Sequence, residues 1–272
     1  MSEQIPRINA SAGPFSIDVV AWWIWWKGRK NRDRVAMTAQ RFLSLFETHG
    51  VAATQIQHFL PELTFDKVQK PESLLPALSI DVLDRAAKLF GVRREWLEGA
   101  DDQIYDCFWC DKHPEHFFEK FQKQNLQHGN FPVHAFTCVD KLDYRGDRNQ
   151  YVVLVFVEKI REIGDVEIFR YVIDGDGWDW GYRRCRIQLK AMVRVVDRYY
   201  GNPVPLYRVQ EAELEGIREG RTIPRLFIRG TPLTDPSLED YVCAESEHGQ
   251  AKECDELPDV KQFMLEHKLP DR

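Results

Sequence analysis

The sequence predicts an α+β protein in which a five-helix bundle precedes a domain built on an antiparallel sheet. Three observations lead to this fold class. The chain has 272 residues, which is long for one small helical domain and suggests two domains. Apolar residues recur at helical spacing as far as residue 99. After residue 102, short apolar runs and strong turn sequences follow, as is typical of strands.

These patterns divide the chain into four parts. Residues 1–30 are expected to be flexible apart from a Trp-rich helix, and residues 31–102 form the helical domain. Residues 103–234 form the α+β domain. Residues 235–272 form an acidic tail with eleven Asp and Glu residues against four Lys and Arg residues.

Composition indicates a globular protein of the cytoplasm. Hydrophobic residues make up 43% of the chain, and the net charge of −6 gives no whole-chain argument for nucleic acid. Six cysteines without a secretory signal favour reduced thiols over a disulfide framework. The run VVAWWIWW at residues 19–26 is too short to span a bilayer. It predicts a helix that docks on the protein or a second subunit, or one that lies on a membrane surface.

Three helices are expected between residues 31 and 70. Asn31 or Asp33 caps a helix that ends at Glu47. Its inner face comprises Val35, Ala39, Phe42, Leu43 and Phe46. A second helix covers residues 52–60, and Thr64 caps a third. Lys70-Pro71 interrupts the third helix early, and a loop is expected from there to residue 78.

The stretch IDVLDRAAKLFGVRREWLEG at residues 80–99 predicts the last two helices of the bundle. Apolar residues at helical spacing mark a helix over residues 80–90, and Gly91 suits a left-handed C-cap. A short helix over residues 93–97 then buries Trp96 and Leu97.

This pair of helices resembles the last two helices of the Cro/C1-type (XRE) helix-turn-helix domain, and the resemblance covers residues 36–99. It implies that the second and third helices form the DNA-reading pair. It also implies that Ile56, Leu60, Leu63 and Val68 point inward. Carried onto this sequence, the groove-facing and capping residues are Thr64, Phe65, Asp66, Lys67, Gln69 and Lys70, and Gln55 and Gln57 are candidates for backbone contact.

A basic cluster precedes the bundle. Such an arm can supply the phosphate contacts that dominate sequence-independent affinity for DNA. A solvated linker is the alternative interpretation. The cluster consists of Lys27, Arg29, Lys30, Arg32 and Arg34.

The second domain begins with a helix over residues 111–124 and continues with strands over residues 151–157 and Val166–Ile173. The sequence DGDG at residues 174–177 predicts a hairpin turn into the next strand. Residues 210–218 predict a helix.

Residues 184–196 alternate between apolar and polar side chains, which predicts a strand. Its polar face would carry Arg184, Arg186, Gln188, Lys190 and Arg194. We expect this face to be the solvent side of the sheet, with an anion or nucleic-acid site as the alternative.

Four metal-ligand residue types lie in CFWCDKHPEHF, which makes zinc a candidate cofactor. The four candidate ligands are Cys107, Cys110, His113 and His116, and others such as His134 or Cys138 could join them. Because no long loop separates the pairs, the cysteines could instead be core residues.

The sequence contains none of the common catalytic motifs, so we expect no enzyme activity. The predicted function is that of a cytoplasmic, bacterial or phage-type transcriptional regulator that binds double-stranded DNA as a homodimer. The α+β domain would then dimerise or sense a ligand. Two alternatives remain open: a protein-interaction module whose helix-turn-helix does not bind DNA, and a zinc-dependent enzyme.

Overall fold

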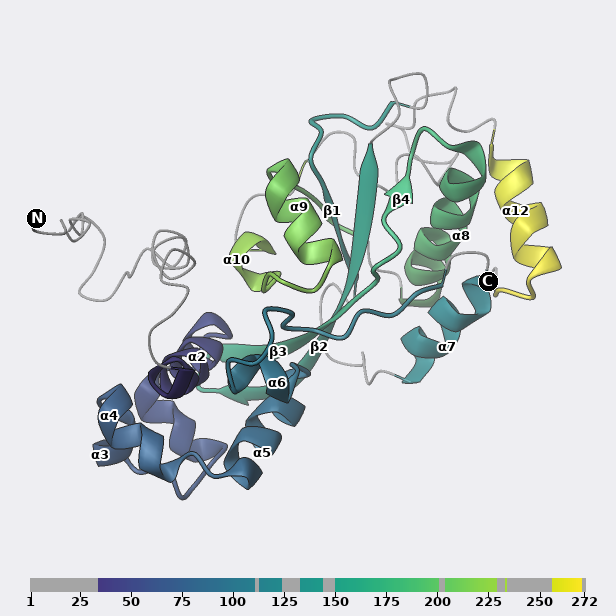
Figure 1. The fold of residues 1–272 in the computed structure, drawn as a ribbon. Coiled ribbons are helices and arrows are strands. Elements are labelled where there is room, and N and C mark those ends of the chain that lie inside the picture. Colours follow the sequence, from purple (N-terminus) through teal and green to yellow (C-terminus); the bar gives the residue numbers. More distant parts are fainter. Residues whose placement is uncertain are drawn as a thin grey trace, which may run out of the picture.

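The computed structural model describes residues 34–110, 113–123, 133–143, 150–200, 204–228, 233 and 256–270. Helices occupy the N-terminal region and a mixed sheet follows, which confirms the predicted α+β class (Figure 1). The expected Trp-rich helix lies outside the described residues.

We define residues 34–97 as the helical unit. Three of its predicted helices are confirmed by the structure. Helix α2 covers Arg34–Thr48, α5 covers Ile80–Phe90 and α6 covers Arg94–Leu97. Ser79 caps α5 by accepting a hydrogen bond from the Val82 amide. Gly91 ends α5 at φ 69°, the left-handed conformation that glycine adopts without strain.

The middle of the helical unit is built from shorter pieces than expected. The predicted second helix is a 3-10 helix, η1, at Ala53–His58, and the third helix, α3, is Phe65–Val68. The expected loop after Pro71 contains α4 (Pro71–Leu74) and η2 (Leu75–Ala77). Lys70 is extended, as a residue before proline prefers, and Pro71 suits the first position of the next helix.

The described strands form one sheet in the order β3-β2-β1-β5. They are β1 (Val133–Thr137), β2 (Tyr151–Ile163), β3 (Val166–Ile173), β4 (Trp178–Asp179) and β5 (Leu206–Arg208). The pairs β1/β2, β2/β3 and β2/β4 are antiparallel, as predicted, whereas β1 and β5 are parallel. The parallel pair needs a long crossover, which helix α8 (Arg183–Tyr200) supplies.

The DGDG sequence does not make the predicted hairpin. Strand β4 pairs with residues 151 and 152 of β2, on the edge where β3 pairs with residues 155–163. Strands β3 and β4 therefore follow one another in the same direction along β2. Residues 174–177 form an insertion between these two strands. Gly177, at φ 65°, allows the backbone to rejoin the edge.

Two hydrophobic cores lie on opposite faces of the sheet. Val153, Val155 and Val157 of β2 belong to the core that contains the helical unit and α9 (Glu211–Arg218). Val152 and Leu154 belong to the other core, with α7 (Pro114–Lys123), α8 and α12 (Leu257–Glu266). Figure 1 shows these two sides: the helical unit and α9 on one, and α7, α8 and α12 on the other. Because successive side chains of a strand point to opposite faces of the sheet, β2 contributes to both cores.

Residues 184–196 are part of α8, so the predicted strand is wrong. Helix α8 packs against the sheet, α7 and α12, and it therefore buries residues around most of its circumference. The charged residues Arg186, Lys190 and Arg194 recur at helical spacing, but the same stretch also alternates between apolar and polar residues, so its sequence fits both a helix and a strand. The expected solvent face is also wrong, because four of its five polar members are buried: Arg186, Gln188, Lys190 and Arg194.

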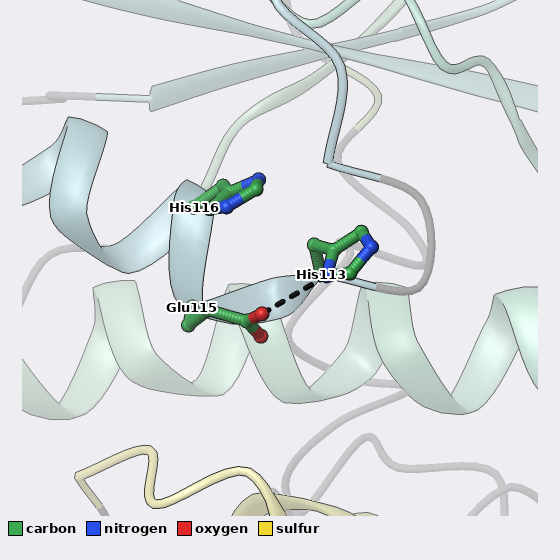
Figure 2. A group of neighbouring side chains, drawn as sticks. All are labelled: His113, Glu115 and His116. Carbon is green, nitrogen blue, oxygen red and sulfur yellow. Dashed lines mark hydrogen bonds and ion pairs between the residues drawn. The ribbon is translucent and has the colours of Figure 1, made fainter.

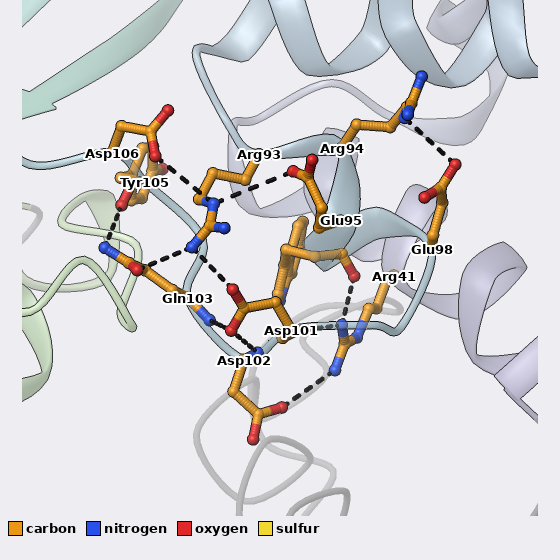
Figure 3. A network of polar contacts seen from close by, with 11 residues as sticks. Arg41, Arg93, Arg94, Glu95, Glu98, Asp101, Asp102, Gln103, Tyr105 and Asp106 are labelled. Carbon is orange, nitrogen blue, oxygen red and sulfur yellow. Dashed lines mark hydrogen bonds and ion pairs between the residues drawn. The ribbon is translucent and has the colours of Figure 1, made fainter.

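Two arginines bond the connecting segment, the stretch after residue 97 that joins the helical unit to the sheet (Figure 3). Arg93 bonds Gln103 and Asp101, each at 2.7 Å, and its backbone amide donates to the carbonyl of Ile104. Arg41, which is buried, donates to the carbonyls of Trp96 and Asp101. The helical unit is therefore fixed to the sheet by a shared core and by its connecting segment.

No helix within the described ranges has both the length and the apolar composition needed to cross a membrane. The predicted helices at residues 111–124 and 210–218 are confirmed as α7 and α9. The acidic region predicted from residue 235 onward contains α12 in its described part, and Val260 and Met264 of that helix are buried against α8.

Candidate functional site

The candidate DNA-reading residues lie at the end of the helical unit that is farthest from the sheet (Figure 1). Val68 of α3 and Ile56 of the neighbouring η1 are buried, and so are Leu60 and Leu63 of the segment between these two helices. These inward positions are confirmed. On the outer side, Phe65, Asp66, Gln69 and Lys70 are exposed, and Thr64 and Lys67 are half-buried. We call this set of six residues the α3 surface.

Local hydrogen bonds order the start of α3. Thr64 is extended, as an N-cap residue is, but its hydroxyl donates to the Asp66 carboxylate at 2.5 Å rather than capping a backbone amide. This bond is the main cause that lowers the pKa of Asp66, so the α3 surface keeps a negative charge at neutral pH. Lys67 Nζ donates to the carbonyl of Glu62 at 2.9 Å.

The neighbouring η1 supplies the two glutamines. The side-chain oxygen of Gln55 accepts from the amide of Ala52 at 2.9 Å and closes the start of η1. Gln57 is half-buried. Arg161, near the tip of the β2–β3 hairpin, donates to the carbonyl of His58 at 2.7 Å and lies over the Phe59 ring. The sheet therefore holds η1 from one side, while α3 faces outward.

The predicted basic arm falls largely outside the described part of the chain. Arg34 begins α2, and Lys27, Arg29, Lys30 and Arg32 lie before the first described residue.

The predicted zinc ligands do not form one group. Cys107 donates from its thiol to the carbonyl of Arg218, and the thiol of Cys110 lies 3.8 Å from Asp174. Among the described residues, potential ligand atoms within 4.8 Å of one another occur in two separate groups. One group is Cys110 with Asp174 and Asp176, and the other is His113 with Glu115 and His116.

Cys110 is a core residue, as the alternative interpretation expected, and Cys107 is half-buried against the core on the other side of the sheet. The amide of Phe108 donates to the carbonyl of Ile173, and the amide of Cys110 donates to the Asp176 carboxylate. The segment is thereby tied to the 174–177 insertion. Burial, aided by the charge of Asp174, raises the pKa of Cys107 to about 11 and also raises the pKa of Cys110. Zinc binds thiolates, and these thiols stay protonated at neutral pH.

Asp174 has no exposed surface and is fully engaged within the protein. It accepts hydrogen bonds from the Trp178 indole at 2.7 Å and from the Asp176 amide at 3.1 Å. Burial is the main cause that raises its pKa well above the usual value. We interpret the Cys110–Asp174–Asp176 group as a structural network, because both Asp174 oxygens already bind protein donors.

His113, Glu115 and His116 converge at the start of α7 (Figure 2). The rings of His113 and His116 stack with centroids 5.0 Å apart. His113 Nδ1 lies 3.0 Å from an oxygen of Glu115, and the pKa of Glu115 is lowered by a hydrogen bond from its own amide and by the one from His113. His267, which follows α12, approaches the other Glu115 oxygen at 3.8 Å.

Sequence reasoning found the two histidines and missed Glu115 and His267. Glu115 stands between the histidines in the sequence HPEH, so its position offered a signal. His267 is about 150 residues away, and no pattern in the sequence connects it with α7.

Comparisons of the chain with protein-family models, with curated proteins and with solved structures find no match. Function must therefore be inferred from the chemistry of these surfaces. The α3 surface offers amide, ammonium and aromatic groups that can contact a macromolecule. The His113 group offers two imidazoles and a carboxylate.

Proposed function

We propose that the protein binds double-stranded DNA through the α3 surface and acts as a transcriptional regulator. The observation that carries this proposal is the two-sided character of α3 and its flanks. Val68 of α3 and Leu63, which precedes α3, are buried, whereas Phe65 and Asp66 of α3 and Gln69 and Lys70, which follow it, are exposed. A helix that enters the major groove needs such an outward row of polar side chains on a fixed scaffold.

The scaffold supports the same proposal. The order α2, η1, α3, α5, α6 follows the helix order of the Cro/C1-type domain that residues 80–99 resemble, with the short helices α4 and η2 added between α3 and α5. Gln69 has the amide that reads adenine edges, and Lys67 and Lys70 can contact phosphates. Lys67 would exchange its bond with the Glu62 carbonyl for a phosphate.

A single short helix such as α3 provides few contacts, so we propose that two copies bind two half-sites. The α+β part would then dimerise or sense a ligand. We place the protein in the cytoplasm, which agrees with the absence of disulfides among the described cysteines.

The test begins with selection of genomic fragments by the purified full chain, followed by binding measurements on a labelled selected duplex at several salt concentrations. Lys67→Ala and Lys70→Ala should each weaken binding and lower the steepness of the salt dependence by about one phosphate contact. Lys88→Ala is the matched control, because Lys88 is also an exposed lysine of the helical unit but lies on α5. Absence of duplex binding at low salt, or an equal loss with Lys88→Ala, would contradict the proposal.

A protein-interaction role is the second candidate, and one observation favours it. Phe65 is 55% exposed, and the two residues that follow it, Asp66 and Lys67, carry opposite charges. Exposed aromatic residues are enriched at protein interfaces, and a surface with balanced charge attracts DNA weakly. Capture of one protein partner that Phe65→Ala abolishes, together with no duplex binding, would favour this candidate over DNA binding.

A further inference from the structure

We propose that His113, Glu115, His116 and His267 form a binding site for one divalent transition-metal ion of the zinc type, which fastens the end of α12 to the start of α7. This proposal is independent of DNA binding. It rests on residues at the start of α7 and at the end of α12, which are far apart in the sequence and are joined by the contact between Glu115 and His267.

The ligand chemistry favours zinc and similar ions. Imidazole nitrogens and a carboxylate oxygen are ligands that Zn²⁺ accepts, whereas Mg²⁺ prefers oxygen ligands and retains its waters. The residues converge without thiols, so the site does not need the deprotonation that burial opposes at Cys107 and Cys110. Both exposed histidines need only to be neutral to bind.

The distances among His113, Glu115 and His116 fit one ion, and His267 lies close enough to Glu115 to become the fourth ligand. Ligand atoms about 2.0–2.1 Å from a tetrahedral zinc ion lie about 3.3 Å from each other. Within the site, His113 Nδ1 lies 3.0 Å from Glu115, and His267 Nδ1 lies 3.8 Å from the second Glu115 oxygen. The ligand atoms of His113, Glu115 and His116 lie within 4.8 Å of one another. His267 lies outside this group and reaches it only through Glu115, so the proposal requires its ring to rotate toward the other three ligands when the ion binds.

The backbone presets the positions of the ligands. The amide of His116 donates to the carbonyl of His113 at 2.9 Å, so the first turn of α7 fixes the spacing of the two histidines. The ring of His267 packs on Phe263 with centroids 4.3 Å apart, and Phe263 packs against the core beside α8. His267 is therefore held beside α7 before any ion binds.

The position of the site gives the ion a structural role. Helices α7 and α12 both pack on α8. The start of α12 is already anchored, because Glu256 bonds both Arg186 and Lys190 of α8. An ion at His267 would anchor the opposite end and would slow opening of α12.

The experiment titrates the full chain with Zn²⁺ in a calorimeter, with Mg²⁺ as a control ion. We expect one Zn²⁺ per chain and no heat with Mg²⁺. His116→Gln should weaken Zn²⁺ binding by more than about 100-fold, since loss of even an outer-shell partner costs 10–100-fold. His267→Gln should weaken it by at least about 10-fold. His58→Gln is the matched control, an exposed histidine on η1 whose loss should change nothing.

A second measurement distinguishes an ion that joins α12 to α7 from incidental binding by surface histidines. Zn²⁺ should slow amide hydrogen exchange in α12 of the wild-type chain and leave that exchange unchanged in His267→Gln. No Zn²⁺ binding would overturn the proposal, and so would binding that His116→Gln and His58→Gln reduce equally. Binding that His267→Gln leaves intact, with no protection of α12, would overturn it as well.

Discussion

The hydroxyl of Tyr105 lies 3.4 Å from Nε2 of His49 and donates a hydrogen bond to it. His49 Nδ1 donates to the carbonyl of Leu45 at 2.7 Å, so the ring is the neutral tautomer with its proton on Nδ1. The ring also contacts Phe90 of α5 and Tyr171 of β3. One buried imidazole therefore joins the end of α2, the connecting segment and the sheet.

This burial makes the helical unit sensitive to acid. Desolvation lowers the pKa of His49 from 6.5 to about 3. Above pH 6.5 the folded and unfolded chains are both neutral at this residue, and His49 contributes no pH dependence. Between pH 6.5 and 3 only the unfolded chain takes up the proton, so the free energy of unfolding should fall by about 1.4 kcal/mol per pH unit.

Urea unfolding of the wild-type chain and of His49→Leu at a series of pH values measures this effect. The variant should be less stable at pH 8, because Tyr105 loses its acceptor, but its stability should fall less steeply between pH 6.5 and 5. Parallel curves for the two proteins would show that His49 is not the group responsible.

The anchoring of α12 by Glu256 predicts a second stability change. Burial would raise the pKa of this carboxyl, but hydrogen bonds from Arg186 and Lys190 lower it to about 2. Glu256→Gln removes the carboxylate charge that both buried cations bind and should cost about 3–5 kcal/mol at pH 7. Glu266→Gln is the control, because Glu266 lies on the exposed side of the same helix.

The pH dependence of this anchor arises from a group that is held in its charged form in the folded protein, whereas His49 is held in its neutral form. A carboxyl with a lowered folded pKa stabilises the protein above its unfolded pKa of 4.5, and the stabilisation is lost as the pH falls from 4.5 toward 2. Limited proteolysis of α12 across this range should show earlier cleavage as the pH falls. In Glu256→Gln, cleavage that still rose steeply over the same interval would assign the effect to another group.

Cys110 should react slowly with alkylating reagents. Its thiol is 1% exposed, and burial raises its pKa, so little thiolate is present or accessible at pH 8. Cys138, which is half-buried, is the internal comparison. Mass mapping of alkylated peptides over time should show modification of Cys138 first, and Cys110 should follow only when denaturant is added. Rapid native modification of Cys110 would contradict the structural role given to it.

Two phenylalanines of the helical unit should differ sharply in their effect on stability. Phe65→Ala removes an exposed ring and should change the free energy of unfolding by less than about 0.5 kcal/mol. Phe46→Ala removes a ring with no exposed surface that contacts Phe42 and Phe90, and should cost about 3–5 kcal/mol. Denaturant melts check both values. A large destabilisation by Phe65→Ala would mean that this residue supports the fold rather than a binding surface.

The sequence by itself determined the elements whose signals are local. The apolar stripe of Ile80–Phe90, its Gly91 cap and the strand Val166–Ile173 are found where the pattern placed them, because each is specified by neighbouring residues. Leu63 and Val68 are buried, as the resemblance of the helical unit to the Cro/C1-type domain implied.

Only the tertiary structure decided the features that depend on distant partners. The sequence of residues 184–196 fits both the alternation of a strand and the spacing of a helix, and only the packing of the sheet, α7 and α12 around this segment shows that it is a helix. The sequence HPEH suggested ligands, but His267 joins them only because α12 packs on α8 beside α7. The insertion at residues 174–177 binds Cys110 in the core, so Cys107 and Cys110 lie apart from the histidines at the start of α7. Contacts between residues far apart in sequence depend on packing, and no local pattern encodes them.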